Sequence, residues 1–281
     1  MNGKFVEISK SFFVAPEYKA EFARLGLTAV DAVFSFAGGK NLVKNNLASY
    51  RSRIQFEMGT PPGTVFLKRY DNAPVLGQLK NWLCHRDRKS YSFFECEAAD
   101  KLTATGINTP KVIAYGEKWG LIFEKRSFII TEKLPEAEAI ERKLPDYFKA
   151  PATQENLGLR KSFISQLAAF IRKFHTAGYR HRDLYFSHVF YGVEKKFYLI
   201  DLARCFEPGL FAERFRVKDI AQLCYSAPTK YFSRTDRLRF YFEYAGQKKL
   251  TRKDKVFISR VLGKVKRIRR HDIRNGRIGP S

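Results

Sequence analysis

The chain has 281 residues, 44% of them hydrophobic, which is enough for one large domain or two lobes with a buried core. Its four cysteines form no CxxC pair or metal-binding spacing, which favours reduced thiols over disulfides or a zinc site. The N-terminus lacks a long apolar segment, and no later stretch is long enough to cross a bilayer. The sequence therefore predicts a soluble or membrane-peripheral protein.

Lysine and arginine outnumber aspartate and glutamate by 52 to 28, giving a net charge of +24. Such a field attracts polyanions, among them nucleic acid, anionic lipid headgroups and phosphorylated glycans. Residues 252–277 are strongly basic, and apolar residues recur among them at helical spacing. A basic amphipathic helix suits an anionic membrane surface, although a solvated basic tail fits the pattern equally well. The predicted apolar face consists of Val256, Ile258, Val261, Leu262, Val265 and Ile268.

The first third of the chain has mainly the patterns of strands. Residues 51–70 alternate on both sides of a Thr-Pro-Pro-Gly turn, which predicts a hairpin. Residues 91–106 predict a helix that ends at a glycine, and residues 111–123 and 127–134 predict two more strands. The helix would bury Phe94, Ala98, Ala99 and Leu102.

Helices dominate the second half. Pro135, Pro145 and Pro151 punctuate the segment that would connect two lobes. A long helix over 157–177 follows and ends at Gly178.

A polar loop then precedes two short strands. The loop reads "HRDLYFSH" (181–188), and the strands "VFYG" and "FYLID" place Asp183 and Asp201 at neighbouring strand ends. Two carboxylates and His188 in this arrangement suit a metal-bound phosphate. One aspartate would deprotonate a substrate hydroxyl, and the other, with His188, would hold a divalent ion on the nucleotide phosphates.

Two upstream residues complete this pattern. A strand lysine would neutralise the phosphates and a helical glutamate would hold that lysine, and Lys68 and Glu95 are the candidates. Taken alone, Lys68 is an ordinary exposed strand residue and Glu95 an ordinary helix residue. Glu97 competes with Glu95, but the apolar Phe94 and Ala98 place Glu95 near the buried face of the helix, which favours Glu95. The order of strand lysine, helix glutamate, HRD loop and strand-ending aspartate is nevertheless that of a protein-kinase-like fold.

The chain as a whole resembles the lipopolysaccharide core kinases, a family of sugar kinases that includes heptose and Kdo kinases. The resemblance spans roughly residues 40–245 in order, which is more specific than any single motif. It is carried by "RSRIQFE", "VFLKRY", "LKNWL", "FFECEAADKLTATGINTPKVIAYG", "SFIITEKL", "FHTAGYRHRDLYFSHVF", "LIDLARC", "VKDIAQLCYSAP" and "RTDRLRFYFEY".

This resemblance implies an α+β, bilobal, protein-kinase-like fold. Residues 1–134 would form a β-rich, nucleotide-binding N-lobe, residues 135–250 a mainly helical C-lobe, and residues 251–281 a basic extension. It also implies ATP-dependent phosphorylation of a heptose or Kdo hydroxyl in the lipopolysaccharide inner core, with Mg²⁺ or Mn²⁺. The protein would act in the cytoplasm, peripherally on the cytoplasmic face of the inner membrane, with the core glycolipid as acceptor.

The resemblance also assigns roles to residues. Asp183 would be the catalytic base and Arg182 would stabilise its loop. Asp201 and His188 would bind the metal.

Lys68, paired with Glu95, would contact the nucleotide phosphates. The backbone near Glu132 and Leu134 would meet adenine. Asp219 would stabilise the HRD loop from beneath. Arg204 fits either a contact to a phosphate or acidic glycan or an ordinary surface salt bridge.

The sequence departs from protein kinases in several places. No G-x-G-x-x-G precedes Lys68, so Lys44, Arg51 or Arg53 in "KNNLASYRSR" would supply charge in place of glycines. The segment "DLA" replaces DFG, and the short stretch after it leaves little room for an activation loop. His188 stands where those kinases use asparagine, although magnesium prefers oxygen ligands.

Three other functions remain open. A pseudokinase or binding module is disfavoured, because Lys68, Asp183 and Asp201 are all present. A kinase of a small soluble molecule would share the fold but would not need so basic a surface. A nucleic-acid-binding protein would use the charge, but the aromatic residues cluster in apolar patterns and no RNA-module signature is present, so no nucleic-acid partner is expected.

Overall fold

The computed structural model describes residues 3–42, 48–148 and 154–276, so Lys44 lies outside the described residues. The chain divides into two compact units. The first comprises Met1–Ala104, Thr109–Pro135 and Asp201–Cys205, and the second comprises Thr105–Asn108, Glu136–Ile200 and Phe206–Ser281. The sheet-rich first unit and the mainly helical second unit confirm the predicted α+β class. The division at residues 134 and 250 stays a prediction, because the structure does not test whether either part folds alone.

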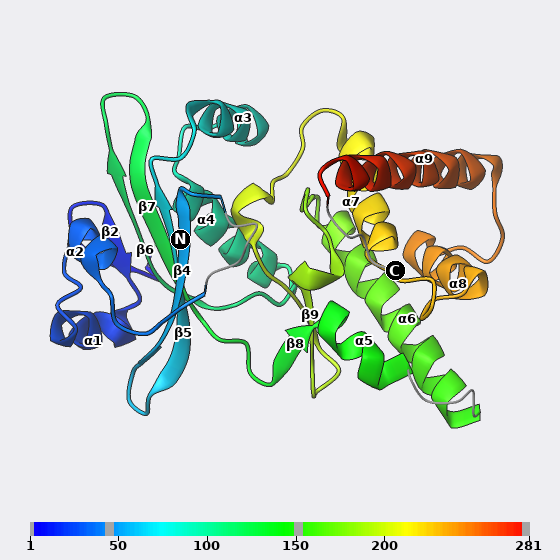
Figure 1. The fold of residues 1–281 in the computed structure, drawn as a ribbon, viewed down its shortest axis with the longest axis horizontal. Coiled ribbons are helices and arrows are strands. Elements are labelled where there is room, and N and C mark those ends of the chain that lie inside the picture. Colours follow the sequence, from blue (N-terminus) through cyan, green and yellow to red (C-terminus); the bar gives the residue numbers. More distant parts are fainter. Residues whose placement is uncertain (1–2, 43–47, 149–153, 277–281) are drawn as a thin grey trace. The chain divides into compact units, whose positions relative to one another are not determined.

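The first unit is built on an antiparallel sheet in the order β1-β2-β6-β7-β5-β4-β3 (Figure 1). Its strands are β1 (Val6–Ser9), β2 (Phe12–Val14), β3 (Lys40–Asn41), β4 (Arg51–Met58), β5 (Gly63–Asp71), β6 (Val112–Trp119) and β7 (Glu124–Glu132). The predicted hairpin over 51–70 is confirmed as β4 and β5, which pair from Arg51–Tyr70 to Met58–Gly63. The two later strands are confirmed as β6 and β7.

Side-chain alternation gives the sheet two different faces. One face, including Leu67, packs on α1 (Lys19–Arg24) and α2 (Val30–Ser35), and the opposite face packs on α4 (Tyr91–Ala104) (Figure 1). The short 3-10 helix η1 (Pro16–Tyr18) precedes α1. The helix predicted over 91–106 is confirmed as α4, and its four predicted core residues are buried.

Three helices of this unit were not predicted from the sequence. They are α1, α2 and α3 (Val75–His85). The first two are only 6 residues long each, too short to show a helical period. In α3 the buried residues are Gln78 and Asn81 while several leucines are exposed, which reverses the pattern that identifies a helix in a soluble domain.

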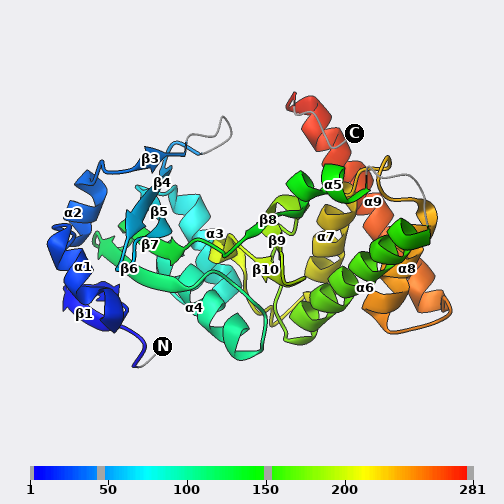
Figure 2. The same cartoon turned by 90° about the horizontal axis from the view of Figure 1, so that it is seen from below.

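The second unit combines a small sheet in the order β10-β9-β8 with long helices. The predicted strands after the polar loop are confirmed as β9 (Val189–Gly192) and β10 (Phe197–Leu199), and the long helix is confirmed as α6 (Gln154–Thr176). Figure 2 shows α6 and α8 running beside each other, and the two helices are in contact. The remaining elements are β8 (Ala137–Ala139), α5 (Ile140–Phe148), η2 (Phe186–His188), α7 (Ala212–Tyr225), α8 (Arg234–Ala245) and α9 (Arg252–Arg274).

The basic C-terminal segment forms α9, which packs on α7. Val261 of the predicted apolar face is buried, as is Phe257, which the predicted face had omitted. Near the other end of α9, the Tyr225 hydroxyl donates a hydrogen bond to Asp272 at 2.8 Å. The helix therefore uses part of its apolar face for packing inside the unit. In the described part of the chain, no helix is both long and apolar enough to span a bilayer.

One buried carboxylate sets the start of α4. Glu124 is 3% exposed and accepts hydrogen bonds from the backbone N–H of Tyr91, at 3.0 Å, and from the Ser127 hydroxyl. Burial raises the pKa of Glu124 to about 7, and these two hydrogen bonds only partly oppose the shift.

We expect this glutamate to destabilise the first unit as the pH rises. Between its unfolded pKa near 4.5 and its folded pKa near 7, the folded state binds more protons than the unfolded state, so stability decreases with increasing pH. The Glu124→Gln variant lacks this titration. Relative to the variant, the free energy of unfolding of the wild type should decrease by on the order of 1 to 3 kcal/mol as the pH rises through this range. Urea denaturation followed by tryptophan fluorescence at several pH values measures the difference, and a difference independent of pH would contradict the assignment.

Candidate active site

A cluster of four charged side chains lies on the α4 face of the sheet. The Lys68 ammonium contacts Glu95 Oε1 at 2.5 Å and Asp201 Oδ1 at 3.1 Å. The Arg53 guanidinium contacts the other oxygen of Asp201 at 3.2 Å. Between 8% and 23% of each of these side chains is exposed, so the cluster is largely shielded from water.

Strand register places two of these cations side by side. Arg53 on β4 is directly opposite Lys68 on β5. Like charges opposite each other across a strand pair are destabilising unless an anion lies between them. Asp201 supplies that anion here, and Arg51, two residues before Arg53, lies over the Tyr70 ring at 5.2 Å. Three cations thus line one stretch of β4 and β5, where phosphate oxygens would find donors.

Glu95 is held by two residues of β5. While Lys68 contacts its Oε1, the buried Tyr70 hydroxyl donates to its Oε2 at 3.1 Å. Tyr70 in turn stacks on Tyr91 of α4, with ring centroids 5.2 Å apart. The competing Glu97 pairs instead with Lys101 on the solvent side of α4, at 3.0 Å. The structure therefore places Glu95, and not Glu97, against Lys68.

Asp201 has an unusual backbone conformation. Its φ of 60° lies in the left-handed region, which is uncommon for a residue other than glycine. The 3-10 helix η3 (Leu202–Arg204) follows at once and packs on α4, with Leu202 and Ala203 almost fully buried. Such strain persists only where the surroundings enforce it, and it is concentrated at functional sites. Arg204, at the end of η3, is half-buried.

In the second unit, the "HRDLYFSH" loop rests on two side chains of α7 and on Ser226, the residue that caps the C-terminus of this helix. Asp219 accepts hydrogen bonds from two consecutive backbone amides of the loop, those of residues 181 and 182, each at 2.8 Å. Gln222 accepts from the amide of Leu184 at 3.2 Å, and Ser226 from that of Phe186 at 3.0 Å. Positions i, i+3 and i+7 lie on one face of a helix, so α7 presents its polar groups in the same order as the loop amides.

Asp219 is the most enclosed of these acceptors, with no exposed surface. Burial acts to raise its pKa, but hydrogen bonds from His175 and from the loop amide outweigh burial, and the pKa of Asp219 lies below its ordinary value. The negative charge it keeps holds Arg182 at a φ of 68° and so fixes the direction of the next residue, Asp183.

The loop also sets the tautomer of His188. Its Nδ1 lies 2.8 Å from the backbone carbonyl of Asp183, and a carbonyl only accepts, so Nδ1 carries the proton. In neutral His188 the lone pair is therefore on Nε2, the nitrogen able to bind a metal or accept a proton. The neighbouring His181 is fully buried, and burial together with His188 lowers its pKa.

The two predicted metal ligands lie in different units and differ in chemistry. The Asp201 carboxylate is the oxygen ligand that magnesium prefers, whereas an imidazole nitrogen from His188 is a ligand typical of transition metals. In residues 3–42, 48–148 and 154–276 no three His, Cys, Asp or Glu side chains lie close enough to form a metal centre by themselves.

The predicted adenine contacts lie at the end of β7. The Glu132 backbone N–H donates to the Lys111 carbonyl at 2.9 Å, and its carboxylate accepts from the Tyr18 hydroxyl at 2.7 Å. Because the N–H of Glu132 is used within the sheet, a base contact by this residue would use its carbonyl. Leu134, two residues on, is 8% exposed.

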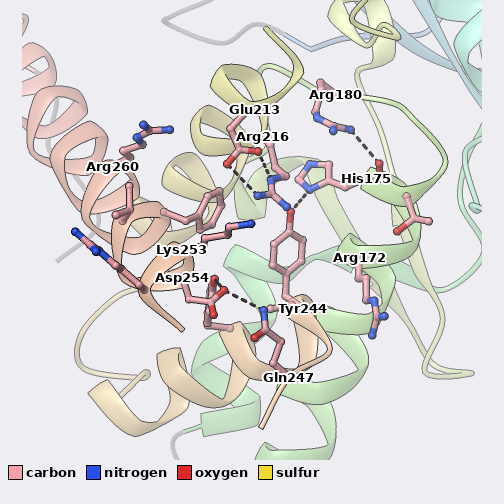
Figure 3. A pocket seen from close by; sticks show the side chains of 16 residues that line it. Arg172, His175, Arg180, Glu213, Arg216, Tyr244, Gln247, Lys253, Asp254 and Arg260 are labelled. Carbon is pink, nitrogen blue, oxygen red and sulfur yellow. Dashed lines mark hydrogen bonds and ion pairs between the residues drawn. The ribbon is translucent and has the colours of Figure 1, made fainter. Parts of the chain in front are cut away.

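A basic cavity of about 830 Å³ lies among α6, α7, α8 and α9 of the second unit (Figure 3). Its cationic lining is Arg172, Arg180, Arg216, Arg252, Lys253 and Arg260. His175 lies at this cavity, accepts a hydrogen bond from the Tyr244 hydroxyl at 2.7 Å and contacts Asp219 at 3.3 Å. Burial lowers the pKa of His175, so the imidazole is neutral near pH 7 and connects the cavity to the loop.

The structure thus brings the predicted residues into two groups. Lys68, Glu95 and Asp201 meet in the first unit, and residues 182, 183 and 188 share one loop in the second. That the two groups face one substrate stays a prediction. Sequence reasoning missed Tyr70, Gln222 and Ser226 as residues that position these groups. For the last two, polar residues at helical spacing in "DIAQLCYS" were the available signal.

We expect loss of the Asp219 carboxylate to be the most damaging change on α7. Asp219→Ala leaves two buried amides and His175 without an acceptor, which should lower the free energy of unfolding by about 3 kcal/mol or more. Gln222→Ala frees one amide and should cost about 1 to 2 kcal/mol. Urea denaturation followed by far-ultraviolet circular dichroism measures the free energy of unfolding of both variants. Equal losses would contradict the expectation that Asp219 contributes more than Gln222.

Comparison with known proteins agrees with these observations. Residues 64–244 match the lipopolysaccharide kinase (Kdo/WaaP) family. The lipopolysaccharide core heptose(I) kinase WaaP of Escherichia coli K12 is 28% identical over 235 residues, covering 80% of this chain and 87% of that protein. WaaP of Pseudomonas aeruginosa PAO1 is 29% identical over 178 residues, covering 61% of this chain and 60% of that protein.

A solved structure described as WaaP in complex with acyl carrier protein superposes with a TM-score of 0.67 at 22% identity, covering 88% of this chain and 95% of that one. This likeness supports the kinase-like fold. The family match covers more than half of the chain and contains Lys68, Glu95 and Asp201, the HRD loop and the α7 face that supports this loop. The chain belongs to the lipopolysaccharide kinase (Kdo/WaaP) family.

Proposed function

We propose that this protein is an ATP-dependent kinase that phosphorylates a heptose or Kdo hydroxyl of the lipopolysaccharide inner core. The observation that carries the proposal is the buried cluster in which Lys68 lies between Glu95 and Asp201, with Arg53 directly opposite. A pair of adjacent cations beside a strained aspartate is suited to a polyphosphate. Membership of the lipopolysaccharide kinase (Kdo/WaaP) family supports a lipopolysaccharide sugar as the acceptor.

The residues would divide the work as follows. Lys68 and Arg53 hold the phosphate oxygens of ATP, and Asp183 accepts the proton of the sugar hydroxyl as the new bond to phosphorus forms. Mg²⁺, or Mn²⁺, held by Asp201 and His188, would neutralise charge on the phosphates. Arg182 and Asp219 act through position, because they fix the direction of Asp183.

The acceptor accounts for the charge of the protein. A core glycolipid carries phosphates and acidic sugars and is anchored in a membrane, so a chain of net charge +24 would be drawn to it on the cytoplasmic face of the inner membrane. Nine exposed cations on α9 support this partner; they are Arg252, Lys253, Lys255, Arg260, Lys266, Arg267, Arg269, Arg270 and Arg274. A kinase whose acceptor is a small soluble molecule would not need these exposed cations.

Loss of the proposed base tests the function directly. Asp183→Asn should lower ATP turnover with core glycolipid by about 10²–10⁴-fold, because it removes the carboxylate proposed to take the hydroxyl proton. Core oligosaccharide from cells that express only this variant should weigh one phosphate less than that from wild type. Glu194→Gln, which neutralises an exposed acid of the second unit, is the matched control. Full turnover by Asp183→Asn, or phosphorylation of a soluble metabolite in place of the glycolipid, would overturn the proposal.

An acyl carrier protein is a second proposed partner, because the solved structure similar to this chain is described as a complex with one. Its support is an apolar cavity of about 240 Å³ among the helices of the second unit, since an acyl chain needs such a space. The lining includes Ile164, Leu167, Phe186, Leu223, Phe257 and Leu262.

This partnership predicts a preference for the acylated carrier. Isothermal titration with purified acyl carrier protein should give at least tenfold tighter binding when it carries a hexadecanoyl chain. Leu262→Glu, at the mouth of the cavity, should remove the preference, whereas Ile273→Glu, an exposed position on the same helix, should not. Equal affinity for the acylated and unacylated carrier would refute the assignment.

A further inference from the structure

Helix α3 of the first unit is oriented with its leucines toward solvent. Leu76 is 70% exposed and Leu83 is 79% exposed, and Leu79 lies on the same side. These positions follow one another at i, i+3 and i+7, so they form one apolar stripe. The residues buried beneath the helix are the polar Gln78 and Asn81.

Hydrogen bonds fix this orientation. The Gln78 amide donates to the carbonyls of Ala73, at 2.8 Å, and Glu124, at 3.0 Å, and accepts from the backbone N–H of Glu124 at 2.9 Å. Turning α3 to bury its leucines would break all three bonds and leave a buried backbone pair unsatisfied. The fold therefore holds the apolar stripe outside.

The turn between β6 and β7 adds two more exposed apolar side chains. Leu121 is fully exposed and Ile122 is 56% exposed, at a turn position where glycine, asparagine and aspartate are usual. Arg88, just after α3, donates to the Ile122 carbonyl at 2.6 Å and so connects the turn to the helix. Figure 1 shows α3 and this turn at the same edge of the first unit.

The two tryptophans of the chain join these elements. Trp82 of α3 and Trp119 of β6 stack with ring centroids 6.1 Å apart, and Arg88 lies over both rings. Both side chains are half-buried. Paired tryptophans beside exposed leucines are typical of the boundary between water and lipid.

We propose that this α3–turn surface, formed by Leu76, Leu79, Leu83, Leu121 and Ile122, inserts into the interfacial region of an anionic lipid bilayer. An exposed apolar cluster on a single chain marks an interaction site, and its surroundings identify the partner. Four exposed cations flank it, against the single exposed carboxylate of Asp87; they are Lys80, Arg86, Arg88 and Lys125. Leucines beside a basic border match an acyl layer beneath anionic headgroups.

This inference deepens the proposed function, since it gives the unit that holds Lys68 its own contact with the membrane in which a glycolipid acceptor lies. The contact is separate from α9, which packs within the second unit. Its test requires no turnover, so membrane binding and kinase activity can fail independently.

Intrinsic fluorescence tests the surface in the unmodified protein, because both tryptophans are on the two elements that carry it, α3 and the end of β6. On addition of phosphatidylethanolamine–phosphatidylglycerol vesicles, tryptophan emission should shift to shorter wavelength and should be quenched by lipids brominated near the headgroup. An unchanged spectrum at saturating lipid would overturn the proposal.

Flotation with the same vesicles tests the individual side chains. The double variant Leu83→Glu/Leu121→Glu should lower the partition coefficient at least tenfold. Val193→Glu/Leu210→Glu, with both positions 67% exposed in the second unit, should leave it unchanged. Equal loss in both variants, retention in both, or a lipid-free dimer that the first variant dissociates would each assign the surface to something other than lipid.

Discussion

The buried Asp219 carboxylate is the interaction on which the second unit depends. It accepts hydrogen bonds from two successive loop amides and holds the second of these residues, Arg182, in a left-handed conformation, which fixes the direction of Asp183. A neutral acceptor in place of Asp219 would form weaker hydrogen bonds with the two amides, because hydrogen bonds to a charged group are roughly twice as strong as those between neutral groups. The charge survives burial only because His175 and the amides surround it.

The first unit uses an opposite arrangement. There, two cations are placed side by side by the register of β4 and β5, and the fold supplies Asp201 and Glu95 to neutralise them. Replacing one of these contacts by a phosphate would cost little, since the Lys68 and Arg53 side chains are already desolvated and aligned. The basic cavity of the second unit also collects cations, and His175 and Asp219 connect it to the HRD loop.

The sequence predicted an element correctly where its pattern of apolar residues is typical of one kind of secondary structure. Alternation and helical spacing predicted the β4–β5 hairpin, α4 and the two strands after the loop. Glu95 was chosen over Glu97 because its neighbours Phe94 and Ala98 are apolar. Asp219 was found through the family resemblance and not through its spacing. Helix α3 was missed for a physical reason, because a helix whose leucines face outward has no signature of burial. Tyr70 was missed because the pattern of a strand does not reveal which of its polar groups reaches a neighbouring helix.

The burial of η3 has a consequence for inhibitor design. Protein kinases carry the glycine of DFG where this chain has Ala203, and that glycine lets the segment act as a mobile switch. Here Leu202 and Ala203 are 2% and 1% exposed, and Ala203 packs with Tyr70 and Tyr91. Turning the segment outward would expose this apolar surface, at about 1.5 to 3 kcal/mol for the leucine alone. Compounds against this protein should therefore be designed for the state in which Asp201 remains against Lys68, and drugs that need the displaced segment should spare it.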